Sequence, residues 1–405
     1  MTATPAGGER LPWRRLATSV LLPTGLAYLA QGAVLPALVL TAQRFGASPS
    51  TAAAVAALVG VGQLGGSVPA GVLAARYGDR RVLVGASLVV CACWSIAFAA
   101  STVPVLGAVA LLAGAGAAAF NVARQSHVVD VVPPAFRARA MSTLGGVGRV
   151  GLLVGPLLAA AAQVPLGARG AYLVGAGAGA LAGLAAWLGE RGHPLSTGTA
   201  APAGPTRRPS SLVAVARSNA RLLATLGLAA AVIASARSLR PVLVPLWAVQ
   251  VGLSAQAVSL LFALTAAVEL ALSYPAGSVM DRWGRAWVAV PCAALMGLGI
   301  LVLPLAASVP GLVAGAVVLG LGSGLGSGVV KTLGADAAPR EDRSAFLGLW
   351  VLVTDVGSSG GPLVAAGLTA ALSLAAASTS LGLVTLVGAG WLAHLLRGSA
   401  RPAPR

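Results

Sequence analysis

A short glycine-containing motif occurs twice in this chain, at positions 206 residues apart. The copies are VPAGVLAARYGDRR at residues 68–81 and YPAGSVMDRWGR at residues 274–285. Each copy follows one long apolar run and precedes another, so each is predicted to form a tight, charged turn between two hydrophobic helices. The same offset relates loop and helix residues along the rest of both halves, which means that corresponding loops have the same length. The chain is therefore predicted to be a duplicated unit, and the duplication determines its architecture.

The apolar runs between the charged turns have the length of membrane spans. They are about 20 residues long, which is what a helix needs to cross the hydrocarbon core of a bilayer. The chain is 57% hydrophobic and only 9% charged, whereas about a quarter of the residues in a soluble domain are charged. We therefore predict an all-α membrane protein with twelve transmembrane helices, at residues 16–40, 50–75, 82–100, 104–126, 141–163, 170–190, 218–248, 256–280, 286–307, 310–333, 344–371 and 375–396.

The predicted spans fall into two pseudo-symmetric six-helix bundles. Residues 1–190 form the first bundle, residues 191–217 a cytoplasmic linker rich in Pro, Gly, Ser and Arg, and residues 218–405 the second bundle with a short cytoplasmic tail. Arginines concentrate in alternate connections, and the positive-inside rule then places both termini in the cytoplasm. Six spans per half is an even number, so the halves share one orientation, as a parallel repeat requires. We expect a multi-pass protein of the cell (inner or plasma) membrane that functions as a monomer.

The charged and polar residues exclude several classes of function. The net charge of +17 comes from arginines that separate hydrophobic segments, so it does not indicate a nucleic-acid-binding face. The three cysteines lie inside apolar runs without the spacing of a zinc site, and no metal is expected. The sequence contains no HExxH motif, no intramembrane Ser/His/Asp set and no phosphate-binding loop. We therefore expect neither an enzyme nor an ATP-driven protein, no cofactor, and a proton or Na⁺ gradient as the energy source.

Two motifs carry a resemblance to the major facilitator superfamily of secondary transporters, over essentially the whole chain. The loop motif resembles its signature G-x-x-x-D-R-x-G-R, which is complete in the second half, whereas the first half has Ala75 in place of the aspartate. The matching residues are Gly277, Asp281, Arg282, Gly284 and Arg285 in the second half, and Gly71, Arg76, Gly78 and Arg80 in the first.

The second motif lies in the fifth predicted helix of the first half and is similar to the G-x-x-x-G-P motif of the superfamily's drug–proton antiporters. Its residues are Gly151, Gly155 and Pro156, with Gly357, Gly361 and Pro362 as the counterparts in the second half. The antiporter glycines that would follow are replaced by Ala159 and Ala160. Close packing of small residues between helices explains the same pattern without that function. The resemblance implies a twelve-helix transporter that works by alternating access to a small-molecule substrate.

The loop motif also has a physical interpretation of its own. Glycine permits a tight turn, and Asp281 can pair with Arg282 or Arg285 or face the positive end of a neighbouring helix. Asp130 and Asp336, in the inner loops after the fourth and tenth helices, are further candidate partners for these arginines. We expect these charges to form a gate at the cytoplasmic end. The alternative is that they only mark the membrane surface.

Five ionisable residues lie deep within predicted spans, where charge is costly and indicates function. They are Arg149, Arg237, Arg240, Glu269 and Asp355. The repeat pairs Arg149 with Asp355, Gln63 with Glu269 and Gln31 with Arg237, and the resemblance implies that the helices carrying them line one central cavity. Aromatic or polar residues that can contact a hydrophobic substrate there, or simply pack helices, are Tyr28, Phe120, Asn121, Trp247, Phe262 and Trp350.

These residues support two functional hypotheses. Desolvation favours the protonated form of a carboxylate and a nearby arginine favours the ionised form, so Asp355 and Glu269 are candidate proton carriers. Arg149, Arg237 and Arg240 are candidate counter-ions or anion contacts, although static ion pairs between helices are an alternative. The first hypothesis is export of a hydrophobic or amphipathic compound in exchange for protons. The second is proton-coupled import of a small anionic metabolite bound by Arg237 and Arg240.

Overall fold

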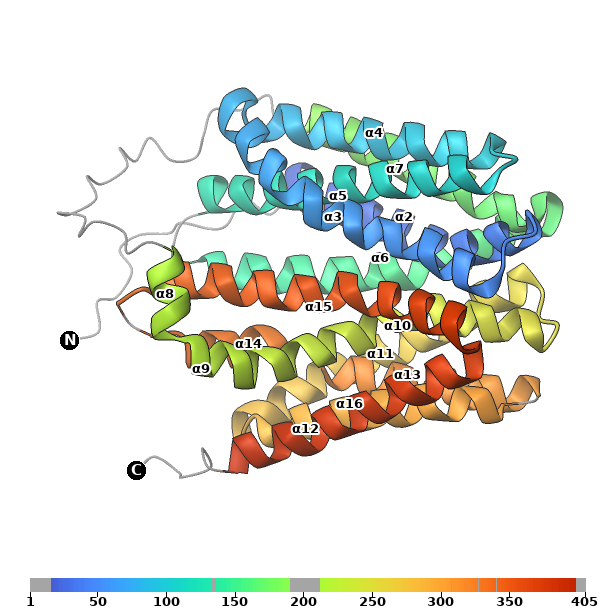
Figure 1. Cartoon of the computed structure of the whole chain (residues 1–405). Helices are drawn as coiled ribbons and strands as arrows, with labels where there is room; N and C mark the ends of the chain where they lie inside the picture. Colours follow the sequence, from blue (N-terminus) through green and yellow to red (C-terminus); the bar gives the residue numbers. More distant parts are fainter. Residues whose placement is uncertain are drawn as a thin grey trace.

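The computed structural model describes residues 16–132, 136–189, 212–306, 308–326, 328–339 and 341–397. Every regular element in these residues is a helix, and the helices run back and forth along one axis in two bundles (Figure 1). The first half, in blue to green, lies above the second half, in yellow-green to red. This arrangement confirms the predicted all-α class.

The first half contains six long helices. A π-helical turn, η1 (Ala17–Leu21), leads into α2 (Leu22–Arg44), and a short 3-10 segment, η3 (Gly167–Arg169), precedes the last helix. The others are α3 (Pro49–Tyr77), α4 (Asp79–Ala99), α5 (Val103–Val131), α6 (Arg137–Leu166) and α7 (Gly170–Leu188).

The second half repeats this order after a short entry. Of the predicted linker, residues 191–211 lie outside the described part, whereas residues 212–217 belong to α8 (Leu212–Ser218). The following elements are α9 (Ala220–Leu222), η4 (Leu223–Gly227), α10 (Leu228–Gln250), α11 (Ala255–Trp283), α12 (Ala286–Val302), η5 (Leu303–Leu305), α13 (Val309–Leu325), α14 (Val329–Ala337), α15 (Arg343–Ala371) and α16 (Leu374–Arg397).

Within the described residues, 11 segments are long and apolar enough to cross a membrane. One of them, Arg139–Leu188, contains both α6 and α7, so the helices themselves make twelve passes. The predicted tenth span at 310–333 lies within the candidate span Val309–Ala337, which is not one continuous helix, because α13 ends at Leu325 and α14 begins at Val329. A run of glycines from Gly320 to Gly328 weakens the helix at this point, since glycine has a low helix propensity.

The sequence repeat is reproduced in the backbone. Adding 206 to the bounds of η1, α2 and α3 gives those of η4, α10 and α11. The turn motifs also match, because Gly78 and Gly284 end α3 and α11 with φ angles of 83° and 98°. Side chains rarely tolerate this left-handed conformation, so glycine is required at the turn.

The two halves contact each other mainly through four long helices. α3 packs against α15 and α6 packs against α11, with α2 and α10 beside them. Ser259 Oγ of α11 donates a hydrogen bond to Gln163 Oε1 of α6 at 3.0 Å, and Ser359 Oγ of α15 donates one to the Gly60 carbonyl of α3 at 3.1 Å. Both bonds lie in the half of the bundle that is remote from α8.

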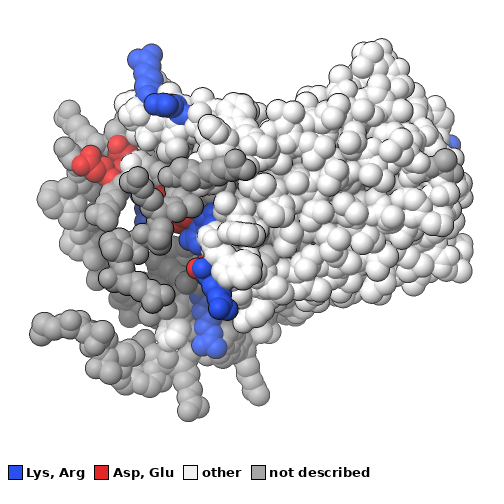
Figure 2. Space-filling view, turned by 90° about the horizontal axis from the view of Figure 1, so that it is seen from below, with Lys and Arg blue, Asp and Glu red and all other residues white. Residues whose placement is uncertain are grey.

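Charged side chains gather at one end of the molecule, and the face seen in Figure 2 is almost free of charge elsewhere. We call this the basic end; it carries α8 and the turns around Gly78 and Gly284 (Figure 1). The opposite end carries the turns before α3 and α11, with Arg44 and Arg169. The charge distribution is that expected of a membrane protein with one basic side.

Candidate functional site

A cavity of about 300 Å³ lies between the two halves. Five of the residues predicted to surround such a cavity line it, namely Gln31, Gln63, Arg237, Arg240 and Glu269. The charged members all come from the second half, on α10 and α11, whereas the first half contributes the two glutamines. The cavity is therefore electrostatically asymmetric although the backbone is nearly symmetric.

Glu269 is the centre of the polar contacts in this cavity. Arg240 Nη1 donates to its Oε2 at 2.9 Å, and Ser323 Oγ donates to its Oε1 at 2.8 Å. The two charged side chains are only 17% and 14% exposed, and such a charge-assisted hydrogen bond is stronger than a neutral one. The guanidinium of Arg240 also lies over the ring of Phe262, 5.8 Å from its centroid. Arg240 is thus held between a carboxylate and an aromatic face.

Arg237 is positioned by the break between α13 and α14. Its Nη2 donates to the Ser323 carbonyl at 3.2 Å, in the last turn of α13. The last carbonyls of a helix lack intrahelical partners, so the break supplies an acceptor here. A Cβ on Gly326 would lie 2.3 Å from Cys292 Sγ and 2.7 Å from Arg237 Nη2, so a side chain here would have to displace these atoms. Discontinuous helices of this kind are common at transporter binding sites, and the glycine run was a signal for it.

Arg149 and Asp355 do not line the cavity. Arg149, on α6, is half-buried and lies close enough to Glu269 and Arg237 to interact with both electrostatically. Asp355 is exposed on α15, one turn toward the basic end from the cavity-lining Ser358. Arg149 lies equally one turn from the cavity-lining Leu152, so the two pseudo-equivalent residues share one depth, and they differ in that Arg149 interacts with Glu269 whereas Asp355 is exposed.

A second, smaller space of about 70 Å³ lies inside the first half. It shares Gln31, Leu35, Val59 and Gln63 with the central cavity, so the two spaces are contiguous. We call it the side pocket; its lining is mainly apolar, with the larger side chains Tyr28, Trp94, Phe120 and Asn121. Trp94 was not predicted from the sequence, because a tryptophan inside an apolar run has no distinguishing pattern.

The predicted aromatic contacts divide into two groups. Tyr28, Phe120 and Asn121 line the side pocket and Phe262 lines the central cavity. Trp247 and Trp350 are buried elsewhere, where Trp247 Nε1 donates to Ser378 Oγ and Trp350 Nε1 to the Val330 carbonyl, both at 3.0 Å. These two tryptophans pack helices together, which is the alternative interpretation given above.

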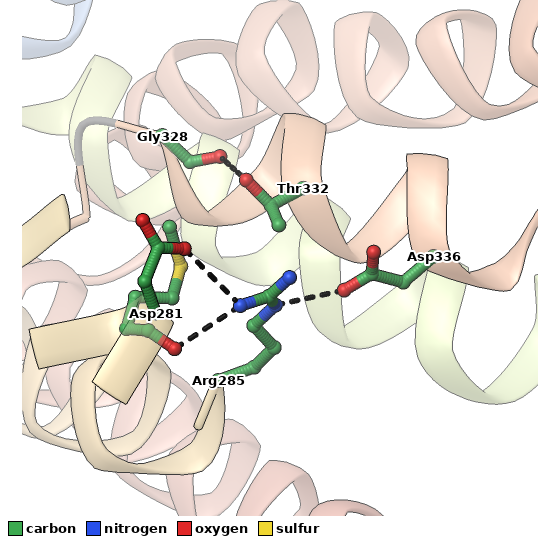
Figure 3. A network of polar contacts seen from close by, with 6 residues as sticks. Asp281, Arg285, Gly328, Thr332 and Asp336 are labelled. Atoms are coloured by element: carbon green, nitrogen blue, oxygen red, sulfur yellow. Dashed lines mark hydrogen bonds and ion pairs between the residues drawn. The ribbon is translucent and has the colours of Figure 1, made fainter. Parts of the chain in front are cut away.

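At the basic end, Arg285 links two carboxylates (Figure 3). Its Nε donates to Asp336 Oδ2 at 2.8 Å, and its Nη1 lies 3.5 Å from Asp281 Oδ1 and 3.1 Å from the Met280 carbonyl. The hydrogen bond with Asp336 raises the pKa of Arg285, against the opposing effect of desolvation. The network joins the turn after α11 to α14, on which Thr332 Oγ1 donates to the Gly328 carbonyl at 3.0 Å.

The first-half copy of this turn makes different contacts. Arg80 donates to the Trp187 carbonyl near the end of α7, and Arg76 lies over the Tyr77 ring at 5.5 Å. The side chain of Asp130 lies outside the described residues, and Arg282 of the second copy is exposed. A Cβ on either Gly71 or Gly277 would meet nothing within 4 Å.

The glycines of α6 and α15 lie at helix crossings. A Cβ on Gly151 or Gly155 would come closer than 3.0 Å to the backbone of α2, and one on Gly357 to that of α10. One on Gly361 would come equally close to Ser235 Oγ of α10. Pro156 belongs to the same α6 surface, where its Cδ faces Gly32 of α2, and Pro362 lines the central cavity.

The contacts between the halves are concentrated away from the basic end. The Ser259–Gln163 hydrogen bond joins the halves toward the opposite end, and the Ser359–Gly60 bond joins them in the cavity wall itself. Toward the basic end, Val68 of α3 and Tyr274 of α11 are 78% and 85% exposed, so the other half does not cover them. Within the described residues, no three His, Cys, Asp or Glu side chains come together as metal ligands.

Comparisons with known proteins agree with this architecture. The sequence profile of the Major Facilitator Superfamily matches residues 20–238 and 225–405. A curated relative, the MFS-type efflux transporter ffsH of Aspergillus flavipes, is 32% identical over 93 residues, which are 23% of this chain and 16% of that protein.

Similar solved structures include a POT family transporter in complex with a thioalcohol-conjugated peptide, with a TM-score of 0.78 and 12% identity over 96% of this chain and 97% of that one. A mutant of the nucleoside transporter NupG is also similar, with a TM-score of 0.72 and 12% identity over 95% of this chain and 100% of that one. At such low identity these structures establish the fold alone. The profile match covers both halves, and the chain therefore belongs to the major facilitator superfamily, whose members are membrane transporters and not enzymes.

Proposed function

We propose that this protein is a proton-coupled transporter of a small organic anion, in which Glu269 carries the proton. The observation that carries the proposal is the Arg240–Glu269 ion pair in the wall of the central cavity. Protonation of Glu269 removes its charge and frees Arg240 to bind an anionic substrate. By reciprocity, a bound anion on Arg240 favours protonation of Glu269. Proton and anion therefore bind cooperatively, which is the requirement for cotransport.

The empty carrier must also be able to close, with neither proton nor substrate bound. Without proton and substrate, Glu269 and Arg240 neutralise each other, so the halves can close without burying either member of this pair unpaired. With both bound, the substrate anion replaces the carboxylate as partner of Arg240. With a proton alone, Arg240 has no counter-ion and closure is costly, which limits proton leakage.

The proposed cycle is alternating access, in which the two halves rock about the cavity. We place the basic end in the cytoplasm of an inner or plasma membrane, with the protein acting as a monomer. Opening to the outside requires loss of the Ser259–Gln163 and Ser359–Gly60 bonds, and Arg285 with its carboxylates forms the cytoplasmic gate. Asp355, between the cavity and the basic end, is proposed as a second proton site on the exit path.

Export of an amphipathic compound in exchange for protons is the second candidate. Three observations favour it: the apolar side pocket, the motif on α6, and the name of the partial relative as an efflux transporter. Exchange requires proton and substrate to compete for one group. A substrate that binds Glu269 directly would satisfy this, although Arg149, Arg237 and Arg240 would oppose a cationic one.

A flux assay with a reversible pH gradient distinguishes the two candidates. The purified chain is reconstituted in liposomes and tested with radiolabelled carboxylates, from which the uptake by protein-free liposomes is subtracted. Cotransport accumulates the anion in the compartment opposite the acidic side, whereas exchange drives the substrate toward the acidic side. Absence of any pH-driven flux above the protein-free control would contradict proton coupling in either form.

A further inference from the structure

We infer that the transported anion carries an apolar group, an aryl ring or a short alkyl chain, and that this group binds in the side pocket of the first half. The inference rests on the proposed function only in taking the central cavity as the place where the anionic group binds. It assigns the side pocket as the subsite that determines specificity.

The first step is the charge of the central cavity. Arg237 and Arg240 face one carboxylate, Glu269, which is already bound by Arg240 and Ser323. Arg237 donates to a neutral backbone carbonyl, so its charge is not neutralised by that bond. Arg149 adds further positive potential from α6. A negatively charged substrate group is therefore favoured in the central cavity, because buried positive charge needs a counter-charge.

The second step is the connection between the two spaces. Gln31 and Gln63 border both the charged cavity and the side pocket. A molecule with its anion at Arg240 can therefore extend past these glutamines into the first half. The side pocket has several times the volume that one water occupies, and its mainly apolar lining offers few partners for water. An apolar group gains free energy by leaving water for such a surface.

The third step is that the pocket wall is held in place. Trp94 stacks on Tyr172 with ring centroids 6.2 Å apart, and the Tyr172 hydroxyl donates to the Ala37 carbonyl at 3.3 Å. Trp94 is 5% exposed and Phe120 is 4% exposed. A rigid, preformed wall loses little entropy on binding, so it favours a ring or chain of matching shape.

These features disfavour the other substrate classes. An amphipathic cation would be repelled by the surplus of arginines, and an uncharged hydrophobe would leave Arg237 without a counter-charge. A small polar anion without an apolar group would satisfy the arginines and leave the side pocket unused. An amphipathic anion is the class that matches both spaces at once.

Binding to the purified full-length chain tests the inference without any gradient. Isothermal titration calorimetry compares three probes: 4-phenylbutyrate, its uncharged amide, and acetate. We expect 4-phenylbutyrate to bind about tenfold or more tightly than either of the others, because the amide loses the charged contact and acetate lacks the apolar group. The pocket variant Ala117→Leu, on α5, should weaken 4-phenylbutyrate binding toward the level of acetate.

The control Ala108→Leu, at an exposed position of the same helix, should leave binding unchanged. Equal affinities of acetate and 4-phenylbutyrate, or normal 4-phenylbutyrate binding by Ala117→Leu, would overturn the side-pocket assignment and leave anion cotransport standing. Equal affinities of the acid and its amide, both weakened by Ala117→Leu, would instead support the subsite and contradict the proposed anion. Failure of all three probes to bind would overturn both the side-pocket subsite and the proposed anionic substrate.

Discussion

Arg240 and Glu269, on the consecutive helices α10 and α11, form an ion pair of 2.9 Å in the central cavity of a transporter whose two halves otherwise share one backbone plan. The first-half counterpart of Glu269 is Gln63, which lines the same cavity without a charge. The two halves thus place equivalent backbone positions at the cavity, and only the second half carries an ionisable side chain at this position. Among the described lining residues, this asymmetry gives the cavity a single carboxylate, Glu269, with the arginines of α10 beside it.

The first prediction concerns the proton carrier. Glu269→Gln should abolish accumulation of substrate driven by a pH gradient, because the amide resembles the protonated acid and cannot release a proton. It should retain exchange of labelled for unlabelled substrate, since that process needs no net proton movement. The matched variant Asp355→Asn should lose less than Glu269→Gln, because Asp355 lies outside the cavity lining. Normal pH-driven accumulation by Glu269→Gln would exclude Glu269 as carrier.

The sequence predicted the general fold because its signals are local and repeated. Apolar runs and clustered arginines specify the spans, and the offset of 206 reappears in the bounds of α3 and α11. Charge inside a span is costly wherever it occurs, so Arg237, Arg240 and Glu269 could be named without a structure.

The details that the sequence did not predict depend on how helices pack. The glycine-rich α5 remains continuous while its counterpart breaks between Leu325 and Val329, so glycine content alone does not specify a break. Asp355 lies on the same face of α15 as the cavity-lining Ser358 and Pro362 but one turn beyond them, and the extent of the cavity along the helix cannot be read from the sequence. The role of Ser323 follows from its proximity to Glu269, which sequence spacing does not reveal.

The second prediction concerns the basic-end network. Asp336→Asn should reduce transport more than Asp281→Asn, because Asp336 lies 2.8 Å from Arg285 and Asp281 lies 3.5 Å away. Both carboxylates are exposed, at 51% and 80%, so neither change should lower stability by more than about 1 kcal/mol. Initial transport rates and thermal unfolding in detergent measure the two effects separately. If both variants transported at the wild-type rate, the network would not act as a gate, and its charges would only mark the membrane surface.

The third prediction uses two glycines of the same helix. Gly155→Ala should destabilise the first half by about 1–3 kcal/mol, because the added methyl group overpacks the crossing with α2. Gly145→Ala, where a Cβ meets nothing within 4 Å, should be neutral or stabilising by up to about 1 kcal/mol, since alanine is the better helix former. Thermal unfolding of the detergent-purified variants compares them. A similar shift in both would mean that the crossing is not closely packed.

The fourth prediction concerns the closed side of the cavity. Gln163 and Ser259 are joined across the halves by a 3.0 Å hydrogen bond, so cysteines at these positions should form a disulfide when the cavity is closed on this side. Oxidation of the double variant should stop transport, because alternating access requires these helix ends to separate, and reduction should restore it.

The native Cys91, Cys93 and Cys292 are half-buried or buried, and replacing them by alanine removes competing pairs. Each single-cysteine variant should transport equally under oxidising and reducing conditions. Undiminished transport by a fully cross-linked double variant would show that this contact persists throughout the cycle, and would contradict the proposed rocking of the two halves.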